Sequence, residues 1–242
     1  IQLRRHIHRH PELSGHEQQT AALVAGELRR WGWQVREGVG RTGVVAELGP
    51  QRGADGRPSP LVALRVDMDA LPVEERTGLD YASTQQGLMH ACGHDIHMTV
   101  WAGVVRALAE KKAGWRGTVI MVAQPAEEII QGARAMLADG LYARFGRPDY
   151  ALAQHDGTGP AGTVQVNLAA NASAADTVDI EVKGVGGHGA YPVDTKDPVV
   201  LASRIVLALQ TLVSRSIDPL EPGVVTVGVI QAGTKRNIIS EE

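Results

Sequence analysis

The chain has 242 residues, of which 43% are hydrophobic and 21% are charged, a composition typical of a soluble globular protein. Its formal net charge of -3 offers no basic face for nucleic acid, and no uninterrupted apolar run approaches the roughly 20 residues that a membrane span needs. A single cysteine, Cys92, excludes an intrachain disulfide and fits a reducing, cytoplasmic compartment.

Strand-like and helix-like segments alternate through the first two thirds of the chain. Apolar residues recur at spacings of three and four within 16–32 and 97–109, which predicts two helices, and 131–139 predicts a short third one. Short apolar runs predict strands at 44–48, 61–66, 118–123 and 150–153, with a Gly- and Pro-rich loop at 49–58. The alternation predicts an α/β layer with a largely parallel sheet covered by helices on both faces.

The pattern changes after about residue 170. Residues 178–182 alternate between apolar and polar side chains, which predicts a half-exposed strand, and 224–230 predict another strand. Between them, 197–213 show helical spacing with Asp197-Pro198 at the start. We therefore predict a second, smaller α+β domain and place the boundary between residues 170 and 171.

Residues able to bind metal or move protons follow the predicted strands. Ligands of open α/β sheets bind beyond the carboxyl ends of the strands, so side chains at these ends are expected to gather at one rim. A further candidate pair lies just before the helix at 97–109. The candidates are Asp67 and Asp69 after the second strand, Glu127 and Glu128 after the third, His155 after the fourth, and Cys92 with His94 before the helix.

Each candidate also has an ordinary structural explanation. A lone buried cysteine is usually an inert small hydrophobe, and a lone histidine is usually a hydrogen-bonded polar residue. The triplet Cys92-Gly93-His94 changes this balance, because it places a thiolate and an imidazole one residue apart across a flexible glycine. Adjacent Glu127 and Glu128 leave a strand in different directions, so one could bind metal while the other handles protons.

Two other histidine-containing segments are less specific. His6, His8 and His10 are spaced by two, so their side chains diverge on a helix, and we predict a polar, partly exposed helix rather than a chelating site. Residues 184–192 form a Gly-rich loop around His188 that lacks the ending of a phosphate-binding loop. Four glycines around one histidine suggest a backbone that passes close to another group.

Taken together, six stretches of the chain resemble the amidohydrolase branch of metallopeptidase family twenty, which includes hippurate hydrolases, aminoacylase-like enzymes and auxin-conjugate hydrolases. The stretches occur in the family's order, at 5–14, 65–72, 89–95, 124–128, 186–192 and 233–239. The resemblance implies a zinc-peptidase-like catalytic domain at 1–170, with a mixed, largely parallel sheet. It also implies an inserted α+β, ferredoxin-like lid and dimerisation domain, of which 171–242 form an incomplete part.

The resemblance also implies a site with two divalent cations, zinc or manganese, with cobalt or nickel as alternatives. The substrate would be a small N-acyl amino acid or amide, and the protein a homodimer formed through the lid. The implied roles are Cys92 as the bridging ligand, His94, Glu128 and His155 as further ligands, Glu127 as the general base, His188 as a catalytic and substrate-binding lid residue, Asn237 as a substrate-binding residue, and Asp67 and Asp69 as residues that orient ligands.

The chain departs from the family pattern in three places. Family members place a last histidine ligand in a C-terminal return of the catalytic domain, so we expect this chain to be a C-terminally truncated fragment that is inactive alone. Residues 156–158 and 237–240 are also less typical. Two alternatives stay open: a dipeptidase or carboxypeptidase, whose branches more often carry Asp at the bridging position, and a non-catalytic, metal-free dimerising homologue.

Overall fold

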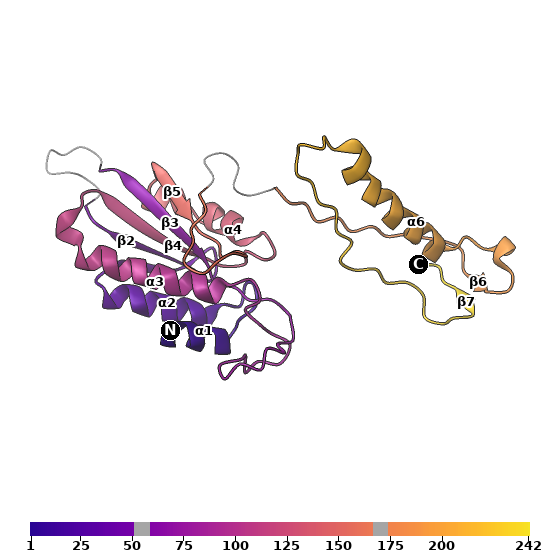
Figure 1. The fold of residues 1–242 in the computed structure, drawn as a ribbon, viewed down its shortest axis with the longest axis horizontal. Helices are drawn as coiled ribbons and strands as arrows, with labels where there is room; N and C mark the ends of the chain where they lie inside the picture. The colour runs from indigo at the N-terminus through magenta and orange to yellow at the C-terminus, as the bar shows by residue number, and fades with distance from the viewer. Residues whose placement is uncertain (51–58, 167–173) are drawn as a thin grey trace. The chain divides into compact units, whose positions relative to one another are not determined.

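The structure is a computed structural model that describes residues 1–50, 59–166 and 174–242 (Figure 1). The chain divides into two compact units, Ile1–Thr163 and Val164–Glu242, which are described separately. Most of the loop predicted at 49–58 lies outside the described residues, and so does the domain boundary predicted between residues 170 and 171.

The first unit is built on a five-stranded sheet in the order β1-β2-β4-β3-β5. The strands are β1 (Gln34–Val39), β2 (Gly43–Leu48), β3 (Leu61–Asp67), β4 (Thr118–Gln124) and β5 (Tyr150–Ala153). β3 pairs in parallel with β4 and β5, whereas β2 pairs antiparallel with β1 and β4. The sheet is therefore mixed, as predicted, but it is not largely parallel, because two of its four strand pairs are antiparallel. Its parallel half carries all three strand ends that precede the candidate site residues.

Helices cover both faces of this sheet, which confirms the predicted layers (Figure 1). α1 (Gln2–Arg9), α2 (Gln18–Arg30) and α3 (His94–Glu110) pack on one face, with a short 3-10 turn, η1 (Lys112–Gly114), after α3. α4 (Gly132–Ala138) and α5 (Leu141–Phe145) pack on the other face. β4 shows why its sequence is apolar throughout: Met121 joins the core under α1 to α3, while its neighbours Ile120 and Val122 join the core under α4 and α5.

Glycines define the ends of two helices that bear on the site. α2 ends at Arg30, and Gly32 then turns the chain with a φ of 77°. α3 begins at His94, three residues earlier than predicted, and Gly93 before it has a φ of 82° that favours glycine. The predicted metal-binding triplet therefore forms the tight turn that starts α3.

The second unit has little regular structure besides one helix. α6 (Pro198–Thr211) is followed by one π-helical turn, η3 (Leu212–Ser216), while η2 (Pro192–Asp194) is a single 3-10 turn. β6 (Gly187–His188) pairs antiparallel with β7 (Ile238–Ile239). The strands predicted at 178–182 and 224–230 are wrong, because both segments are irregular and lack the backbone partners that a strand needs.

Within the described residues, one helical segment, 198–216, is long and apolar enough to cross a membrane by length and composition alone. It is interrupted by Arg204 and Arg215, and arginines inside a span are costly. The prediction that no run approaches a span therefore holds for uninterrupted apolar residues only.

Candidate metal centre

The cysteine and two of the histidines predicted as ligands converge in the first unit. Cys92 and His94 lie in the turn that begins α3, and His155 follows β5. The Cys92 Sγ atom is 3.5 Å from His155 Nε2. Ligand atoms of all three side chains lie within 4.8 Å of one another. The topology thus brings together residues separated by more than 60 positions, because α3 packs on β3 and β5 is the neighbour of β3 in the sheet.

Both glutamates after β4 face the same histidine. His94 Nε2 is 3.8 Å from Glu127 Oε2 and 3.7 Å from Glu128 Oε1. Glu128 is the more buried of the two side chains, at 17% exposure against 36% for Glu127. The turn that carries them includes Ala126 with a φ of 47°, a left-handed conformation that is uncommon for alanine. The structure therefore collects the four predicted metal ligands and the predicted base at one edge of the sheet.

Two buried atoms in this group lack the hydrogen-bond partners that buried polar atoms normally have. They are His94 Nε2 and Glu128 Oε1, and they lie 3.7 Å apart. The opposite ring atom, His94 Nδ1, is 2.8 Å from the backbone oxygen of Asp69, to which it donates a proton. A neutral His94 therefore presents its Nε2 lone pair toward the carboxylates. Thiolate, imidazole and carboxylate are a donor set suited to zinc, so the residues fit a divalent cation.

The pKa values of the site residues also fit the binding of a cation. Burial and the charges of Glu128, Glu127 and Asp67 raise the pKa of Cys92 to about 12. Burial lowers the pKa of His94, but its hydrogen bond to Asp69 and the nearby carboxylates outweigh this and raise it to about 9. Burial likewise raises the pKa of Glu128. The raised pKa values mean that Cys92, His94 and Glu128 hold protons more strongly among these carboxylates, and a bound cation would compensate the same negative charge.

The two predicted orienting residues, Asp67 and Asp69, both lie against ligand candidates. Asp69 Oδ2 accepts hydrogen bonds from the Ser14 hydroxyl at 2.6 Å and from the Glu128 backbone N–H at 3.0 Å. Asp67 Oδ2 lies 3.7 Å from His94 Nε2 and 2.8 Å from Arg65 Nη1. Burial raises the pKa of Asp67, but its hydrogen bond with His97 and the charges of His94 and Arg65 outweigh burial and lower it to about 2.

Sequence reasoning missed a buried glutamate that supports the turn before Glu127 and Glu128. Glu17 is fully buried, and its carboxylate accepts hydrogen bonds from Thr42 at 2.6 Å and from the Ala126 N–H at 2.8 Å. The second contact spans 109 positions, and no local pattern in the sequence signals it. Glu17 thus fixes the residue that immediately precedes Glu127.

His97 was also missed, although its spacing offered a signal. It lies three positions after His94, so a helix that starts at residue 94 places both rings on the same side. His97 Nδ1 is 2.8 Å from Asp67 Oδ1, and His97 Nε2 is 2.9 Å from Asp156 Oδ1. A helix predicted to begin only at residue 97 hid this relation.

The polar helix predicted around His6, His8 and His10 forms as α1 and is partly exposed, but His8 itself is buried. His8 is 4% exposed, with Nδ1 2.9 Å from Asp95 and Nε2 3.3 Å from Glu75. α1 packs against α3, which buries the face of α1 that carries Ile7 and His8. His6 and His10 remain exposed, and none of the three belongs to a potential metal-binding group among the described residues.

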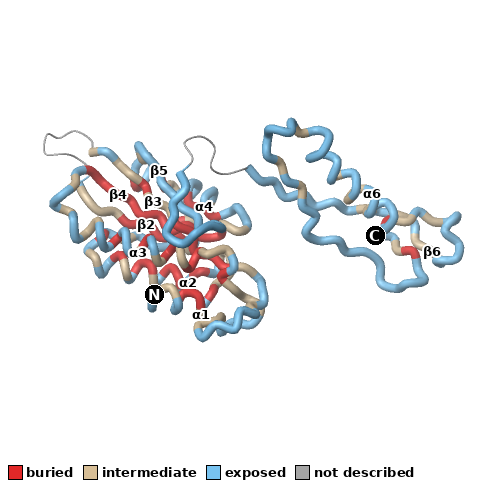
Figure 2. Tube along the Cα trace, in the orientation of Figure 1, coloured by how far each residue is buried: buried red, intermediate tan, exposed pale blue. Residues whose placement is uncertain are grey.

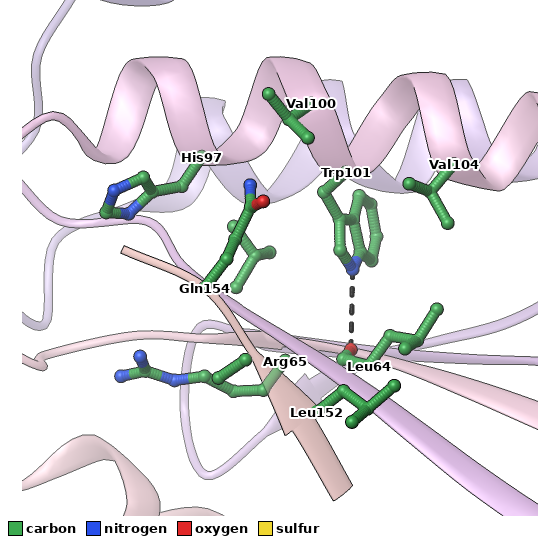
Figure 3. Close-up of a pocket in the computed structure, with 10 residues that line it drawn as sticks. Leu64, Arg65, His97, Val100, Trp101, Val104, Leu152 and Gln154 are labelled. Carbon is green, nitrogen blue, oxygen red and sulfur yellow. Dashed lines mark hydrogen bonds between the residues drawn. The ribbon is translucent and has the colours of Figure 1, made fainter. Parts of the chain in front are cut away.

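A pocket of about 140 Å³ lies beside the metal group, between α3 and the end of β5 (Figure 3). Apolar side chains such as Val100, Trp101 and Leu152 form most of its lining, and the Trp101 Nε1–H donates to the backbone oxygen of Leu64. His97 lines the pocket, whereas Cys92, His94, Glu127, Glu128 and His155 do not. We therefore do not assign the substrate to this pocket.

The remaining predicted site residues, His188 and Asn237, lie next to each other in the second unit. His188 pairs with Ile238 between β6 and β7, and the Gly189 N–H donates to the Asn237 backbone oxygen at 2.9 Å. The Ala190 N–H donates to His188 Nδ1 at 3.1 Å. A neutral His188 therefore carries its proton on Nε2 and can donate it to a ligand. Their relation to the metal group stays a prediction.

Known proteins are similar to this chain in sequence and in fold. The chain is 40% identical over 240 residues to the hippurate hydrolase of Campylobacter jejuni, and the match covers 99% of the chain and 61% of that protein. It is also 40% identical over 245 residues to thermostable carboxypeptidase 1 of Saccharolobus solfataricus, a match that covers 100% of the chain and 61% of the relative.

A solved structure supports the same assignment. The YxeP protein of Bacillus subtilis, described as a dinuclear metal binding peptidase from the M20 family, matches 98% of the chain with a TM-score of 0.67 and 30% identity, over 60% of its own length. The chain thus spans about three fifths of these relatives. The sequence profile of peptidase family M20/M25/M40 matches residues 63–239. Because this match includes every predicted metal ligand, the expected resemblance is confirmed, and the chain belongs to peptidase family M20/M25/M40.

Proposed function

We propose that the whole protein is a metal-dependent amidohydrolase that cleaves the amide bond of N-acyl amino acids or similar small amides. The proposal rests on one observation, the convergence of Cys92, His94 and His155 within 4.8 Å, with Glu127 and Glu128 both facing His94. The hippurate hydrolase relative supports this substrate class, since it matches 99% of the chain.

Four residues would hold a pair of divalent cations, zinc or manganese: Cys92 between the two, with His94, Glu128 and His155. Such cations supply Lewis acidity toward the amide carbonyl and lower the pKa of water. The backbone oxygen of Asp69 keeps the His94 lone pair on Nε2 by accepting a hydrogen bond from Nδ1–H. Asp67 holds a negative charge beside the same ring and is itself fixed by Arg65.

Glu127 is the general base of the proposed reaction. Its carboxylate faces the centre, yet it is more exposed than Glu128, so it can reach both the water and the substrate. It takes a proton from the attacking water and returns that proton to the nitrogen of the leaving amine. Glu17 supports this role by fixing the backbone of Ala126, one residue earlier.

The second unit serves in this proposal as part of an α+β, ferredoxin-like lid that also forms a homodimer. His188 donates its Nε2 proton to the carbonyl or carboxylate oxygen of the substrate, since its Nδ1 is occupied by the Ala190 N–H. Asn237 lies beside it, held by its backbone contact to Gly189, and contacts the substrate from the same side of the lid.

Replacing Glu127 by Gln in the full-length protein tests the assignment. The substitution removes the proton acceptor but keeps size and polarity, so hippurate hydrolysis should fall by about 10²–10⁴-fold while bound metal, measured by elemental analysis, stays at the parental amount. Glu128→Gln is the matched control and should lose metal as well as activity. Hydrolysis by Glu127→Gln at the parental rate would sink the proposal.

A peptidase of the same family is the second candidate, because the carboxypeptidase relative is as similar to the chain as the hippurate hydrolase is. The cysteine at the proposed bridging position favours the amidohydrolase. Comparing kcat/KM for a panel of N-acyl amino acids and dipeptides separates the two. A third candidate, a metal-free dimerising homologue, predicts that the purified full-length protein contains no zinc or manganese.

A further inference from the structure

Of the four proposed ligands, His155 has the least support from the rest of the protein. Its side chain is 53% exposed, whereas that of His94 is fully buried. It follows β5, an edge strand whose four residues are all exposed. Its Nδ1 atom is 2.8 Å from the backbone oxygen of the adjacent Asp156, a contact that orients the ring but does not tie this segment to the sheet. Apart from the 3.5 Å approach of its Nε2 to Cys92 Sγ, the position of His155 therefore depends on contacts made by the segment that carries it.

His97 provides such a contact from α3. Its ring is 1% exposed, and its Nε2 is 2.9 Å from both the backbone nitrogen and Oδ1 of Asp156. Its Nδ1 is 2.8 Å from Asp67 Oδ1 at the end of β3. The ring also meets the ring of His155 edge-on, with centroids 4.4 Å apart. Figure 3 shows His97 on α3 at the end of the pocket where Gln154 lies, next to the segment it holds.

The hydrogen bonds of His97 connect the same two partners in either protonation state. A neutral ring donates its Nδ1 proton to Asp67 and accepts the Asp156 N–H at Nε2. A protonated ring donates to the carboxylates of Asp67 and Asp156 instead. The ring thus joins the end of β3 to the segment after β5 without depending on a change of charge.

Asp156 in turn packs against the turn that carries two other ligands. A Cβ atom built at Gly93 would lie 2.3 Å from Asp156 Oδ1, so a side chain at this position would displace the carboxylate from its place against the turn. Gly93 separates Cys92 from His94 in the sequence. The contacts therefore form a closed circuit from the ligand turn through α3 and His97 to Asp156 and back to the turn.

We propose that His97 is a positioning residue, which holds His155 over the Cys92–His94 turn by bridging Asp67 and Asp156. The inference rests on the proposed function in one respect, the role of His155 as a ligand. It assigns His97 no contact with substrate and no step in proton transfer.

Two substitutions in the full-length protein separate the two ends of the bridge. In His97→Asn the shorter amide still reaches Asp67 but not Asp156, whereas in His97→Gln the longer amide can accept the Asp156 N–H. Zinc titrations against a competing chelator should show about 10–100-fold weaker binding at one of the two sites in His97→Asn, and a smaller loss in His97→Gln. His6→Asn, at an exposed histidine of α1, is the matched control and should bind zinc like the parent.

A second readout is independent of metal and of turnover. In the metal-free protein, hydrogen exchange at the Asp156 amide should accelerate in His97→Asn and stay near the parental rate in His97→Gln, because only glutamine replaces the lost acceptor. Zinc affinity and amide protection must change together. If His97→Asn does not fold, His97→Gln carries the test, and a loss of zinc affinity of more than about 10-fold with retained protection, or parental zinc affinity with lost protection, would overturn the proposal.

Parental zinc affinity and parental protection in a folded His97→Asn would overturn it as well. These outcomes are distinct from failure of the proposed function, which is decided by the turnover of Glu127→Gln and leaves zinc binding and amide exchange untouched.

Discussion

The two units of the chain show what an apolar sequence pattern can and cannot specify. In residues 1–163, apolar residues of the sheet and helices form two buried clusters, one on each face of the sheet. In the described part of 164–242, only Pro198 and Ile239 are buried, and most of the unit is exposed (Figure 2). Both units carry apolar segments that predict helices and strands, and the difference lies in whether another element covers them.

Helix and strand respond differently to the absence of a partner. α6 forms although many of its apolar side chains are exposed, because a helix makes its backbone hydrogen bonds within itself. The segments 178–182 and 224–230 do not form strands, because a strand needs a neighbour to accept its backbone hydrogen bonds. An apolar pattern therefore predicts a helix more safely than a strand at the edge of a domain.

The largest expected effect concerns buried volume. Leu28 on α2 is fully buried, and Leu207 on α6 is 70% exposed. Leu28→Ala should lower the free energy of unfolding by about 2–5 kcal/mol, since it leaves a cavity in the core. Leu207→Ala should change it by less than about 0.5 kcal/mol. Urea unfolding of both variants measures the contrast. A comparable loss in the two would show that Leu207 is covered in solution, which would break the comparison.

The second prediction sharpens the contrast through pH, because the groups with shifted pKa values lie in the first unit. Cys92 and His94 have pKa values raised to about 12 and about 9, so both hold protons at pH 7, whereas metal ligands must be deprotonated. Binding should release about two protons per chain, and zinc affinity should rise by up to about 100-fold per pH unit near neutrality. Calorimetry in buffers of different ionisation enthalpy counts the protons.

The sign of the stability effect is opposite in the metal-free protein. His94 has a folded-state pKa above its unfolded value of 6.5, so its contribution is complete below pH 6.5 and is lost as pH rises toward 9. Thermal stability without metal should therefore fall over the range in which zinc binding strengthens.

For the number of protons released on zinc binding, Cys92→Ser is the matched control and should release one proton fewer. An unchanged proton count in that variant would contradict the thiol as a ligand.

The sequence predicted most of the first unit because each element there has its own local signal. β4 is a continuous apolar run since its alternate residues enter two different cores, and Gly32 marks the end of α2. The start of α3 was misplaced, since its first turn carries polar residues whose burial only the fold explains: His94 and His97 are buried against Asp67 and Asp69.

The candidate site could be predicted to the extent that it follows strand ends. Residues after β3, β4 and β5 meet because those strands are adjacent and parallel, a rule that needs no knowledge of side-chain contacts. The supporting contacts could not be found this way. Glu17 reaches Ala126 across 109 positions and His8 reaches Asp95 across 87, and such contacts follow from helix packing rather than from spacing. His188 and Asn237 in the second unit show the same limit, since their adjacency depends on β6 pairing with β7.

The smallest expected effect tests whether α6 depends on its own cap rather than on packing. The Asp197 carboxylate accepts hydrogen bonds from the backbone N–H groups of Val199 and Val200. By contrast, α3 begins after Gly93 without a side-chain cap and is held by buried residues. Asp197→Ala should therefore destabilise α6 by about 1 kcal/mol, seen as lost helical signal in far-UV circular dichroism, while zinc binding in the first unit stays unchanged. Asp197→Asn keeps an acceptor and should retain the helical signal. An undiminished signal in Asp197→Ala would mean that contacts along its apolar face hold α6, so this face would be covered in solution and the difference drawn between the two units would not hold.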